Sequence, residues 1–290
     1  MKKYNNLRKN SSIPWFEKDI ADKILKKKSN NLTEQEKKDA RFFITNGYVI
    51  LKNIISEKFC DSLRDDFFKI TKSNDFKKNP KYFHYNKSPR IIEGWKKSNF
   101  IKKICFEKKI ISFLKLMYGN EPVPISTINF LKGTEQPLHS DYIHFGSLPE
   151  LYLAGVWFAL EKIDFTNGPL QICPKSHKLD IVDFTDLKLK IPKTTSELKS
   201  NYTKYEKYLL KIISKKKLRR KKIKLNKGDV LIWAANLLHG GSKIKNEKKT
   251  RLSQVVHYHF KGLKKIYNPC FSSRLNGMYA ERNINSIKIK

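Results

Sequence analysis

The sequence predicts a mainly β protein with additional α-helices (an α+β fold), in which an N-terminal helical layer packs on a β-sandwich core. Three observations lead to this fold class. Apolar residues recur at helical spacing up to about residue 121. From about residue 122, short apolar segments alternate with Gly, Pro and Asn. The 290 residues, of which 39% are hydrophobic, are enough for the core of one such domain.

The first elements are predicted from helix-capping signals. Residues 1–38 form a basic extension with one short amphipathic helix. Thr33 and Glu36 fit a capping box, in which the Thr hydroxyl accepts from a backbone amide of the first turn and the Glu side chain reaches back. The helix that they open is expected to end at Asn46-Gly47, because glycine readily adopts the positive φ of a helix C-terminus.

A buried strand and two more helices follow. The run Tyr-Val-Ile-Leu at 48–51 predicts the strand. Helical spacing predicts an amphipathic helix whose apolar face is Phe59, Leu63, Phe67 and Ile70. A polar stretch at 72–90 precedes a further helix across residues 100–117.

The C-terminal half is predicted to consist of short strands with one helical insertion. Strand candidates are 123–131, 138–145, 151–161, 168–173, 223–234 and 249–261. The insertion has one apolar face, made by Leu198, Tyr202, Tyr205, Leu209, Ile212 and Ile213, and such long excursions commonly act as lids. We therefore expect a main domain at 39–272 with a helical layer (39–121), a β core (122–262) and a helical flap (about 179–221), followed by a tail at 273–290.

The formal net charge of +34 has two interpretations. Clustered Lys and Arg, as in the run 215–222, favour a nucleic-acid partner because they release counterions from phosphates. Lysine is, however, spread along the whole chain together with Asn, Ile, Phe and Tyr, as AT-rich codon usage produces. Because net charge reports on solubility and non-specific association, compositional drift is favoured, and nucleic acid is not an expected partner.

Signals for a cellular compartment are few. No apolar run approaches the roughly 18 to 20 residues of a membrane-spanning helix, and the N-terminus has no apolar segment after its positive charges. Four cysteines, Cys60, Cys105, Cys173 and Cys270, are scattered without zinc-like spacing. They are typical of reduced thiols in a cytoplasmic protein.

The segment 136–142 carries the strongest chemical signal. On a strand, residues i and i+2 point to one side, so His139 and Asp141 offer an imidazole nitrogen and a carboxylate oxygen to one ion. The third ligand must come from elsewhere, and His239 is the best candidate because two glycines follow it and permit close approach of other groups. Two histidines and one carboxylate are typical of non-haem Fe(II) centres with open positions. Taken alone, His-x-Asp also fits a surface turn whose Asp caps a loop.

A second signal follows twelve residues after His239. One face of the strand expected there consists of Arg251, Ser253, Val255, His257 and His259. An inward guanidinium is costly unless an anion meets it. The distal carboxylate of 2-oxoglutarate would do so bidentately, with the Ser253 hydroxyl as a further donor. The alternative is a buried ion pair between Arg251 and a carboxylate such as Asp229, but the neighbouring metal motif favours the cosubstrate.

Four segments together resemble the phytanoyl-CoA dioxygenase family of Fe(II)/2-oxoglutarate oxygenases. They are FFITNGYV at 42–49, PLHSDY at 137–142, the motifs VWFAL, NGPL and PKSHK between 156 and 178, and the stretch from GDVLI at 228–232 to residue 251. The resemblance covers residues 42–272 and implies a double-stranded β-helix (jelly-roll, cupin-like) core. It implies His139, Asp141 and His239 as iron ligands and Arg251 as the cosubstrate anchor. It also implies that Trp157 lines the cosubstrate pocket and that Ser253 lies beside the anchor.

Two positions depart from the family pattern. Lys175 stands where a glycine usually precedes Ser-His, so this turn is expected to differ. Gly241 stands where some members place a hydroxyl, which removes one cosubstrate contact but no metal ligand. The presence of Asp141 argues against the halogenase variants of related folds, which replace this carboxylate with a small residue.

Residues around the metal motif are candidates for substrate contact. Gln136, Tyr142, Phe145 and His257 either touch substrate or pack in the core, whereas His177 is expected to be structural. We expect an oxygenase that uses Fe(II), 2-oxoglutarate and O2, hydroxylates a small organic metabolite and releases succinate and CO2. The basic composition favours an anionic metabolite. The alternatives are a non-catalytic metal-binding β-sandwich protein and a basic nucleic-acid-associated oxygenase.

Overall fold

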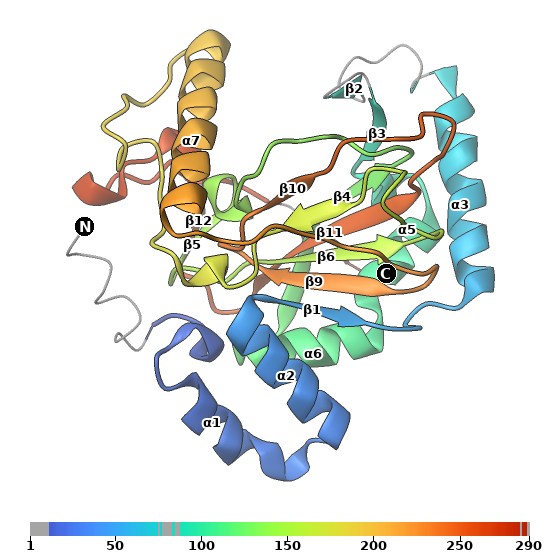
Figure 1. Cartoon of the computed structure of the whole chain (residues 1–290), viewed down its shortest axis with the longest axis horizontal. Coiled ribbons are helices and arrows are strands. Elements are labelled where there is room, and N and C mark those ends of the chain that lie inside the picture. The colour runs from blue at the N-terminus through green and yellow to red at the C-terminus, as the bar shows by residue number, and fades with distance from the viewer. Residues whose placement is uncertain (1–11, 75, 77–82, 85–87, 285, 289–290) are drawn as a thin grey trace.

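The structure, a computed structural model, describes residues 12–74, 76, 83–84, 88–284 and 286–288 (Figure 1). Its helices are α1 (Ala21–Lys28), α2 (Glu34–Asn46), α3 (Glu57–Lys72), α5 (Asn99–Lys103), α6 (Lys108–Tyr118) and α7 (Thr195–Lys215). Its strands are β1 (Tyr48–Leu51), β2 (Phe83–His84), β3 (Ser88–Ile92), β4 (Pro122–Phe130), β5 (Gly146–Leu148), β6 (Ala154–Ala159), β7 (Leu170–Ile172), β8 (Lys221–Lys222), β9 (Val230–Ala234), β10 (His239–Gly241), β11 (Ser253–Phe260) and β12 (Lys265–Tyr267). The first eleven residues of the predicted extension and parts of the polar stretch 72–90 lie outside the described residues.

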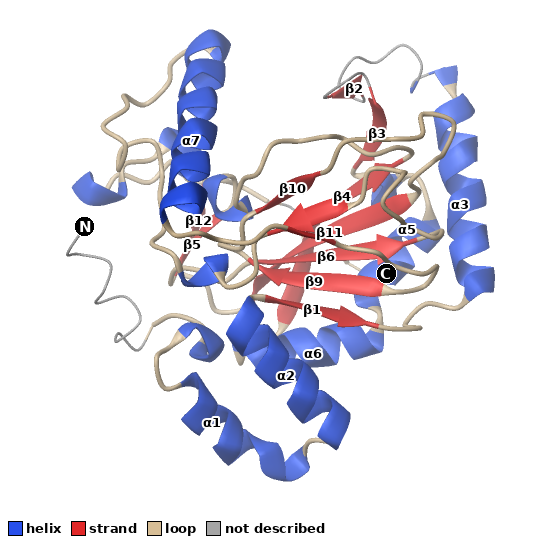
Figure 2. Ribbon diagram, in the orientation of Figure 1, coloured by secondary structure: helices blue, strands red, loops and turns tan. Residues whose placement is uncertain are grey.

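Antiparallel sheets form the centre of the molecule (Figure 2). Among the described residues, the large sheet has seven strands in the order β1-β9-β6-β11-β4-β3-β2. A three-stranded sheet has the order β10-β7-β8, and β12 pairs with β5. The predicted combination of helices with antiparallel strands is therefore confirmed.

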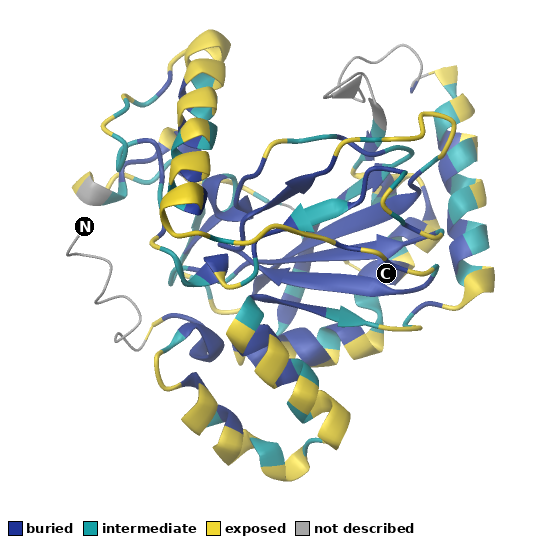
Figure 3. Cartoon of the chain, in the orientation of Figure 1, coloured by how far each residue is buried: buried dark blue, intermediate teal, exposed yellow. Residues whose placement is uncertain are grey.

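Side chains of the central strands alternate between two apolar cores. On β6, Val156 and Phe158 belong to the core shared with α2, α3 and α6, whereas Trp157 and Ala159 belong to a second core that reaches Ile172 of the small sheet. Successive side chains of a strand point to opposite faces, so each central strand is buried on both sides (Figure 3). The second face carries the candidate site.

The helix-capping predictions are confirmed. The Thr33 hydroxyl accepts from the Glu36 amide (3.2 Å), and the Glu36 carboxylate accepts from the Thr33 amide (2.8 Å). Gly47 ends α2 with φ of 78°, and a Cβ there would lie 2.4 Å from Nδ1 of His177. The helix predicted across 100–117 is interrupted, because a 3-10 turn at Ile104–Phe106 separates α5 from α6. Glu107 then caps α6 by accepting from the Lys109 amide.

The insertion contains α7, which packs beside the candidate metal ligands. Its buried residues Tyr205, Leu209 and Ile213 share an apolar core with Leu138 and Leu238, the immediate neighbours of two predicted ligands in the chain. The helix is opened by a capping box between Thr194 and Glu197. Part of the wall around the metal motif thus comes from the insertion.

Two further features concern the chain as a whole. No helix among the described residues combines the length and the apolar character needed to cross a membrane. The four cysteines are buried and form no disulfide. Burial raises the pKa of the Cys173 thiol to about 11, with Arg220 opposing the shift, so this thiol is a poor nucleophile.

Candidate metal centre

The predicted strand at 138–145 is wrong. His139 forms only an isolated antiparallel bridge with His239, in which each amide donates to the other's carbonyl over 2.9 Å. The chain then forms a short 3-10 helix, Asp141–Ile143, because the Tyr142 amide donates to the carbonyl of Ala235 and not to a neighbouring strand. The two side chains converge through this turn and not through a common strand face.

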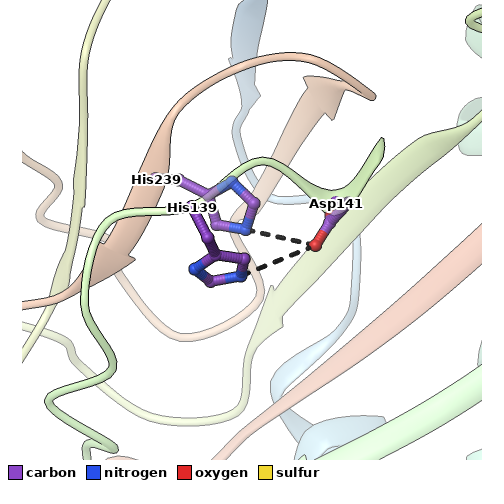
Figure 4. Close-up of side chains that lie close together, drawn as sticks. All are labelled: His139, Asp141 and His239. Carbon is purple, nitrogen blue, oxygen red and sulfur yellow. Dashed lines mark ion pairs between the residues drawn. The ribbon is translucent and has the colours of Figure 1, made fainter. Parts of the chain in front are cut away.

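His139, Asp141 and His239 lie together, as predicted (Figure 4). One potential ligand atom from each lies within 4.8 Å of the others, and all three residues are buried. Oδ1 of Asp141 is 3.8 Å from Nε2 of His139 and 3.5 Å from Nε2 of His239. These spacings place one carboxylate oxygen and two imidazole nitrogens around a common point.

Hydrogen bonds to the backbone select the tautomer of both histidines. Nδ1 of His139 lies 2.9 Å from the carbonyl of Pro137, and Nδ1 of His239 lies 3.0 Å from that of Leu237. A carbonyl can only accept, so both Nδ1 atoms carry the hydrogen and both Nε2 atoms present a lone pair. The side-chain amide of Gln136 donates to Nε2 of His139 over 3.2 Å, a hydrogen bond that a metal held by this nitrogen would replace. The donor set therefore fits a divalent transition metal.

Electrostatics keep these donors in the protonation states that a metal requires. Burial, aided by His239, lowers the pKa of His139 to about 3, so its imidazole is neutral at pH 7. Burial alone would raise the pKa of Asp141, but the imidazoles of His239 and His257 outweigh it and hold that pKa well below its usual value. The site thus combines the neutral imidazole of His139 with the ionised carboxylate of Asp141.

The second oxygen of Asp141 is held by two groups. The indole Nε1 of Trp233 donates to Oδ2 over 2.7 Å, and Nε2 of His257 lies 3.4 Å from the same atom. Both contacts orient the carboxylate so that Oδ1 faces the histidines. Trp233 was missed by the sequence analysis, although its place in the alternating run 230–234 assigns it to the same face as Leu231. A Cβ on Gly155 would lie 2.2 Å from its indole, so a glycine is required there.

The two glycines after His239 let the small sheet approach the metal motif. A Cβ on Gly240 would lie 2.7 Å from the carbonyl oxygen of Gln136, and one on Gly241 would lie 2.7 Å from the amide of Glu135. Both contacts are with backbone atoms, which cannot rotate away. As predicted, these glycines allow close approach of other groups. At Gly241, a larger side chain would clash with the backbone of Glu135.

Arg251 lies two residues before β11 and is 1% exposed. Its Nη1 donates to the carbonyl of Gly168 (3.1 Å), its Nη2 is 3.4 Å from that of Lys132, and its Nε is buried without a hydrogen-bond partner. Burial lowers its pKa to about 10, with Glu161 opposing the shift. The alternative ion pair with Asp229 is wrong, because that carboxylate accepts from two backbone amides, those of residues 53 and 226.

A cavity of about 760 Å³ contains both the metal cluster and Arg251. Of the other predicted site residues, those that line it are Gln136, Phe145, Trp157 and His257. Ser253 and Tyr142 are not among the described lining residues. The Ser253 hydroxyl donates to the carbonyl of Arg251, and the Tyr142 hydroxyl bonds with Glu150 and Tyr267. Strand alternation correctly predicted that the Ser253 side chain faces the interior. Its hydroxyl, however, donates to the backbone two residues earlier and does not line the cavity.

The cavity also has walls that the sequence analysis did not predict. Arg90 pairs across β3 and β4 with Phe130, whose ring lies under the Arg251 guanidinium at 5.5 Å. At the other end, Tyr202 of α7 and Arg282 of the C-terminal segment line the cavity. The apolar face of α7 was predicted, but no sequence signal indicated which residues of that face reach the site.

Curated proteins of one kind are similar to this chain. It is 25% identical over 179 residues to the peroxisomal phytanoyl-CoA dioxygenase of Rattus norvegicus (51% of this chain, 49% of the relative). It is 24% identical over 180 residues to that of Homo sapiens (52% and 49%). The chain spans about half the length of the curated relatives that it matches.

Solved structures share its fold. EctD from S. alaskensis with bound Fe aligns with a TM-score of 0.65 at 16% identity, covering 90% of this chain and 89% of that one. The epimerase SnoN from nogalamycin biosynthesis, in complex with Fe3+, alpha ketoglutarate and nogalamycin RO, aligns with a TM-score of 0.62 at 13% identity (88% and 99%). The family model described as phytanoyl-CoA dioxygenase (PhyH) matches residues 43–253, and the chain belongs to this family.

Proposed function

We propose that this chain is an Fe(II)- and 2-oxoglutarate-dependent oxygenase. One observation carries the proposal: a single cavity joins a buried cluster of two histidines and one carboxylate to Arg251, a buried cation that forms no ion pair with a carboxylate of the described residues. Family membership and the fold shared with iron- and 2-oxoglutarate-bound proteins support it. In this proposal the facing sheets form a double-stranded β-helix, and the oxygenase domain spans residues 39–272.

Each residue has a distinct role in this proposal. His139, Asp141 and His239 hold Fe(II) through Nε2, Oδ1 and Nε2, while Trp233 and His257 keep the carboxylate in position. When bound, iron with 2-oxoglutarate and O2 supplies oxidising power, with succinate and CO2 as products.

Arg251 is proposed to anchor the distal carboxylate of 2-oxoglutarate. Its guanidinium lies between the rings of Phe130 and Trp157, at 5.5 and 5.3 Å, so an anion there is shielded from water. Low polarity strengthens a bidentate contact between guanidinium and carboxylate. The two backbone carbonyls that accept from Arg251 fix the guanidinium before the cosubstrate arrives.

The outcome proposed for the organic substrate is hydroxylation of a small metabolite. The proteins of similar structure include an epimerase and a carbocyclase, so related folds direct the same cofactors to other products. Substrate placement in the cavity decides between these outcomes. Product analysis by mass spectrometry distinguishes them, since hydroxylation adds one oxygen atom to the substrate.

Succinate formation is the first test. Wild type is incubated with Fe(II), ascorbate, O2 and 2-oxoglutarate, without added substrate, beside His139→Ala and Arg251→Ala. Arg220→Ala is a matched control, because Arg220 is exposed and does not line the cavity. We expect slow succinate release by wild type and control and none by the two site variants. If wild type forms no succinate, and anaerobic Fe(II) with 2-oxoglutarate gives no visible charge-transfer band, the proposal is overturned in favour of a non-catalytic metal-binding protein.

A further inference from the structure

The cavity continues past the metal cluster into a second region, here called the outer lobe. Its described residues come from the metal-binding segment, from α7 and from the C-terminal segment: His144, Phe145, Lys199, Tyr202, Phe271 and Arg282. Direct contacts connect four of them, His144, Phe145, Tyr202 and Arg282. Nε2 of His144 is 2.9 Å from the Tyr202 hydroxyl and the two rings stack, while the Phe145 ring stacks on His257 at 4.9 Å.

The outer lobe is too far from Arg251 to share that cation. The outer lobe contacts the main sheet where the Phe145 ring stacks on His257, six residues beyond Arg251. An extended chain rises roughly 3.3 Å per residue, so the two Cα atoms are about 20 Å apart. A ligand in the outer lobe therefore meets the cations of that lobe, not the proposed cosubstrate anchor.

Arg282 is positioned as an anion receptor. Its Nη1 donates to the carbonyl of His144 over 2.8 Å, and its guanidinium carbon lies 4.5 Å from the centre of the Phe145 ring. It forms no ion pair with any described carboxylate, and its Nε and Nη2 have no hydrogen-bond partner among the described residues. These two N–H groups point from the same edge of the planar group, the spacing that carboxylate and phosphate oxygens accept bidentately.

The other side chains of the cavity agree with an anion that has an apolar body. Among the described lining residues the cations are Arg90, Lys199, Arg251 and Arg282, whereas the acids are the proposed metal ligand Asp141 and Glu206 of α7. The Phe145 ring lies beside Arg282, and Phe271 and Cys270 are further apolar residues of the lining.

We propose that the outer lobe binds the organic substrate through a carboxylate or phosphate group, which Arg282 holds bidentately, and packs the apolar body of the substrate against Phe145. This inference rests on the proposed oxygenase function, because it assigns the outer lobe to the substrate and Arg251 to the cosubstrate. It makes Arg282, a residue of the C-terminal segment, a determinant of substrate class.

The test compares three small probes that share a phenyl group. Phenyl phosphate, 3-phenylpropionate and the neutral 3-phenylpropan-1-ol are titrated calorimetrically into the full chain loaded with Zn(II) and saturating 2-oxoglutarate, so that the Arg251 site is already filled. Arg282→Gln removes the charge but keeps an amide donor for the His144 carbonyl. Arg282→Lys keeps the charge without the planar fork. Arg220→Gln removes one exposed cation elsewhere and is the matched control.

We expect Arg282→Gln to weaken binding of an anionic probe at least about tenfold, with Arg282→Lys intermediate, because hydrogen bonds to charged groups exceed neutral ones in strength. Binding of the alcohol should change less than about twofold, and Arg220→Gln should change neither. The anion that wild type binds more tightly identifies the group as carboxylate or phosphate.

Three outcomes would overturn the inference. In the first, wild type binds neither anionic probe saturably, and in the second, Arg282→Gln weakens binding of the alcohol as much as binding of the anions. In the third, Arg220→Gln weakens binding of the anions as much as Arg282→Gln does. Binding of 2-oxoglutarate to the Zn(II)-loaded chain is measured first, with Arg251→Ala as its negative control. If wild type does not bind 2-oxoglutarate, the oxygenase proposal fails. If wild type binds 2-oxoglutarate but the affinity for the anionic probes does not change when Arg282 is substituted, only the outer-lobe assignment fails.

Discussion

Replacing Arg251 with methionine should separate cosubstrate binding from folding. Methionine keeps much of the volume and the apolar stem of the side chain but removes the guanidinium. In the absence of 2-oxoglutarate, the wild-type cation is buried and forms no ion pair with a carboxylate of the described residues, although Glu161 is near enough to oppose the lowering of its pKa. We therefore expect the variant to fold with stability close to that of wild type and to bind 2-oxoglutarate much more weakly.

The magnitudes follow from the surroundings of Arg251. Burial lowers its pKa to about 10, and keeping the cation there costs roughly 3 kcal/mol. Removing it relieves this cost but deprives the carbonyls of Gly168 and Lys132 of their donor, at roughly 1–3 kcal/mol each. The two effects largely offset each other, so the unfolding free energy should change by no more than about 3 kcal/mol. Loss of a buried bidentate contact to an anion should weaken 2-oxoglutarate binding about 100-fold or more.

Thermal unfolding of the Zn(II)-loaded protein measures both quantities. At 2-oxoglutarate concentrations 100 times the wild-type Kd, ligand binding stabilises wild type by about 2.7 kcal/mol. The same concentration would stabilise a variant that binds 100-fold more weakly by only about 0.4 kcal/mol. For a chain of this size the expected increase in Tm falls from roughly 5–10 °C to about 1 °C. A variant that keeps the full increase in Tm would refute the role of Arg251 as the anchor.

Three other changes test the surroundings of the site. Gly241→Ser should lower metal affinity and stability by about 1–3 kcal/mol, since its Cβ would lie 2.7 Å from the backbone amide of Glu135, and Co(II) titration with thermal unfolding measures both. Trp233→Phe should weaken metal binding about 10- to 100-fold, as measured by chelator competition, because Asp141 loses its 2.7 Å indole donor. Burial lowers the pKa of His259 to about 4, so the unfolded chain takes up a proton near pH 6.5 and the folded chain does not. Stability of the metal-free protein should therefore fall as pH drops from 6.5 to 4, by up to roughly 3 kcal/mol from this group, and denaturant unfolding of His259→Phe should show a shallower fall.

Each of these predictions has a contradicting result. Wild-type metal affinity in Gly241→Ser would mean that the segment at 135–137 moves freely away from β10. Unchanged affinity in Trp233→Phe, with its fold intact by near-UV circular dichroism, would assign the orientation of Asp141 to His257 alone. A pH dependence of stability in His259→Phe that matches wild type would show that other groups control the loss in acid.

Features with a local cause follow from the amino-acid sequence alone. The capping box of Thr33 and Glu36 and the helix end at Gly47 depend on hydrogen bonds and φ angles within a few residues. Strand alternation sorted the central segments correctly because its period of two is a property of the backbone. The grouping of His139, Asp141 and His239 was also predicted, since a third ligand was required, two glycines follow His239, and the family resemblance implied the same three residues.

Contacts between distant segments decided the rest. The turn at Asp141 replaced the predicted strand because Tyr142 bonds to Ala235, and Trp233 reaches the carboxylate from another strand of the main sheet. Arg282 meets the metal-binding segment from almost 140 positions further along the chain. A hydrogen bond of this kind leaves no periodicity or spacing in the sequence, because its two groups are brought together by packing of the whole domain and not by the local backbone.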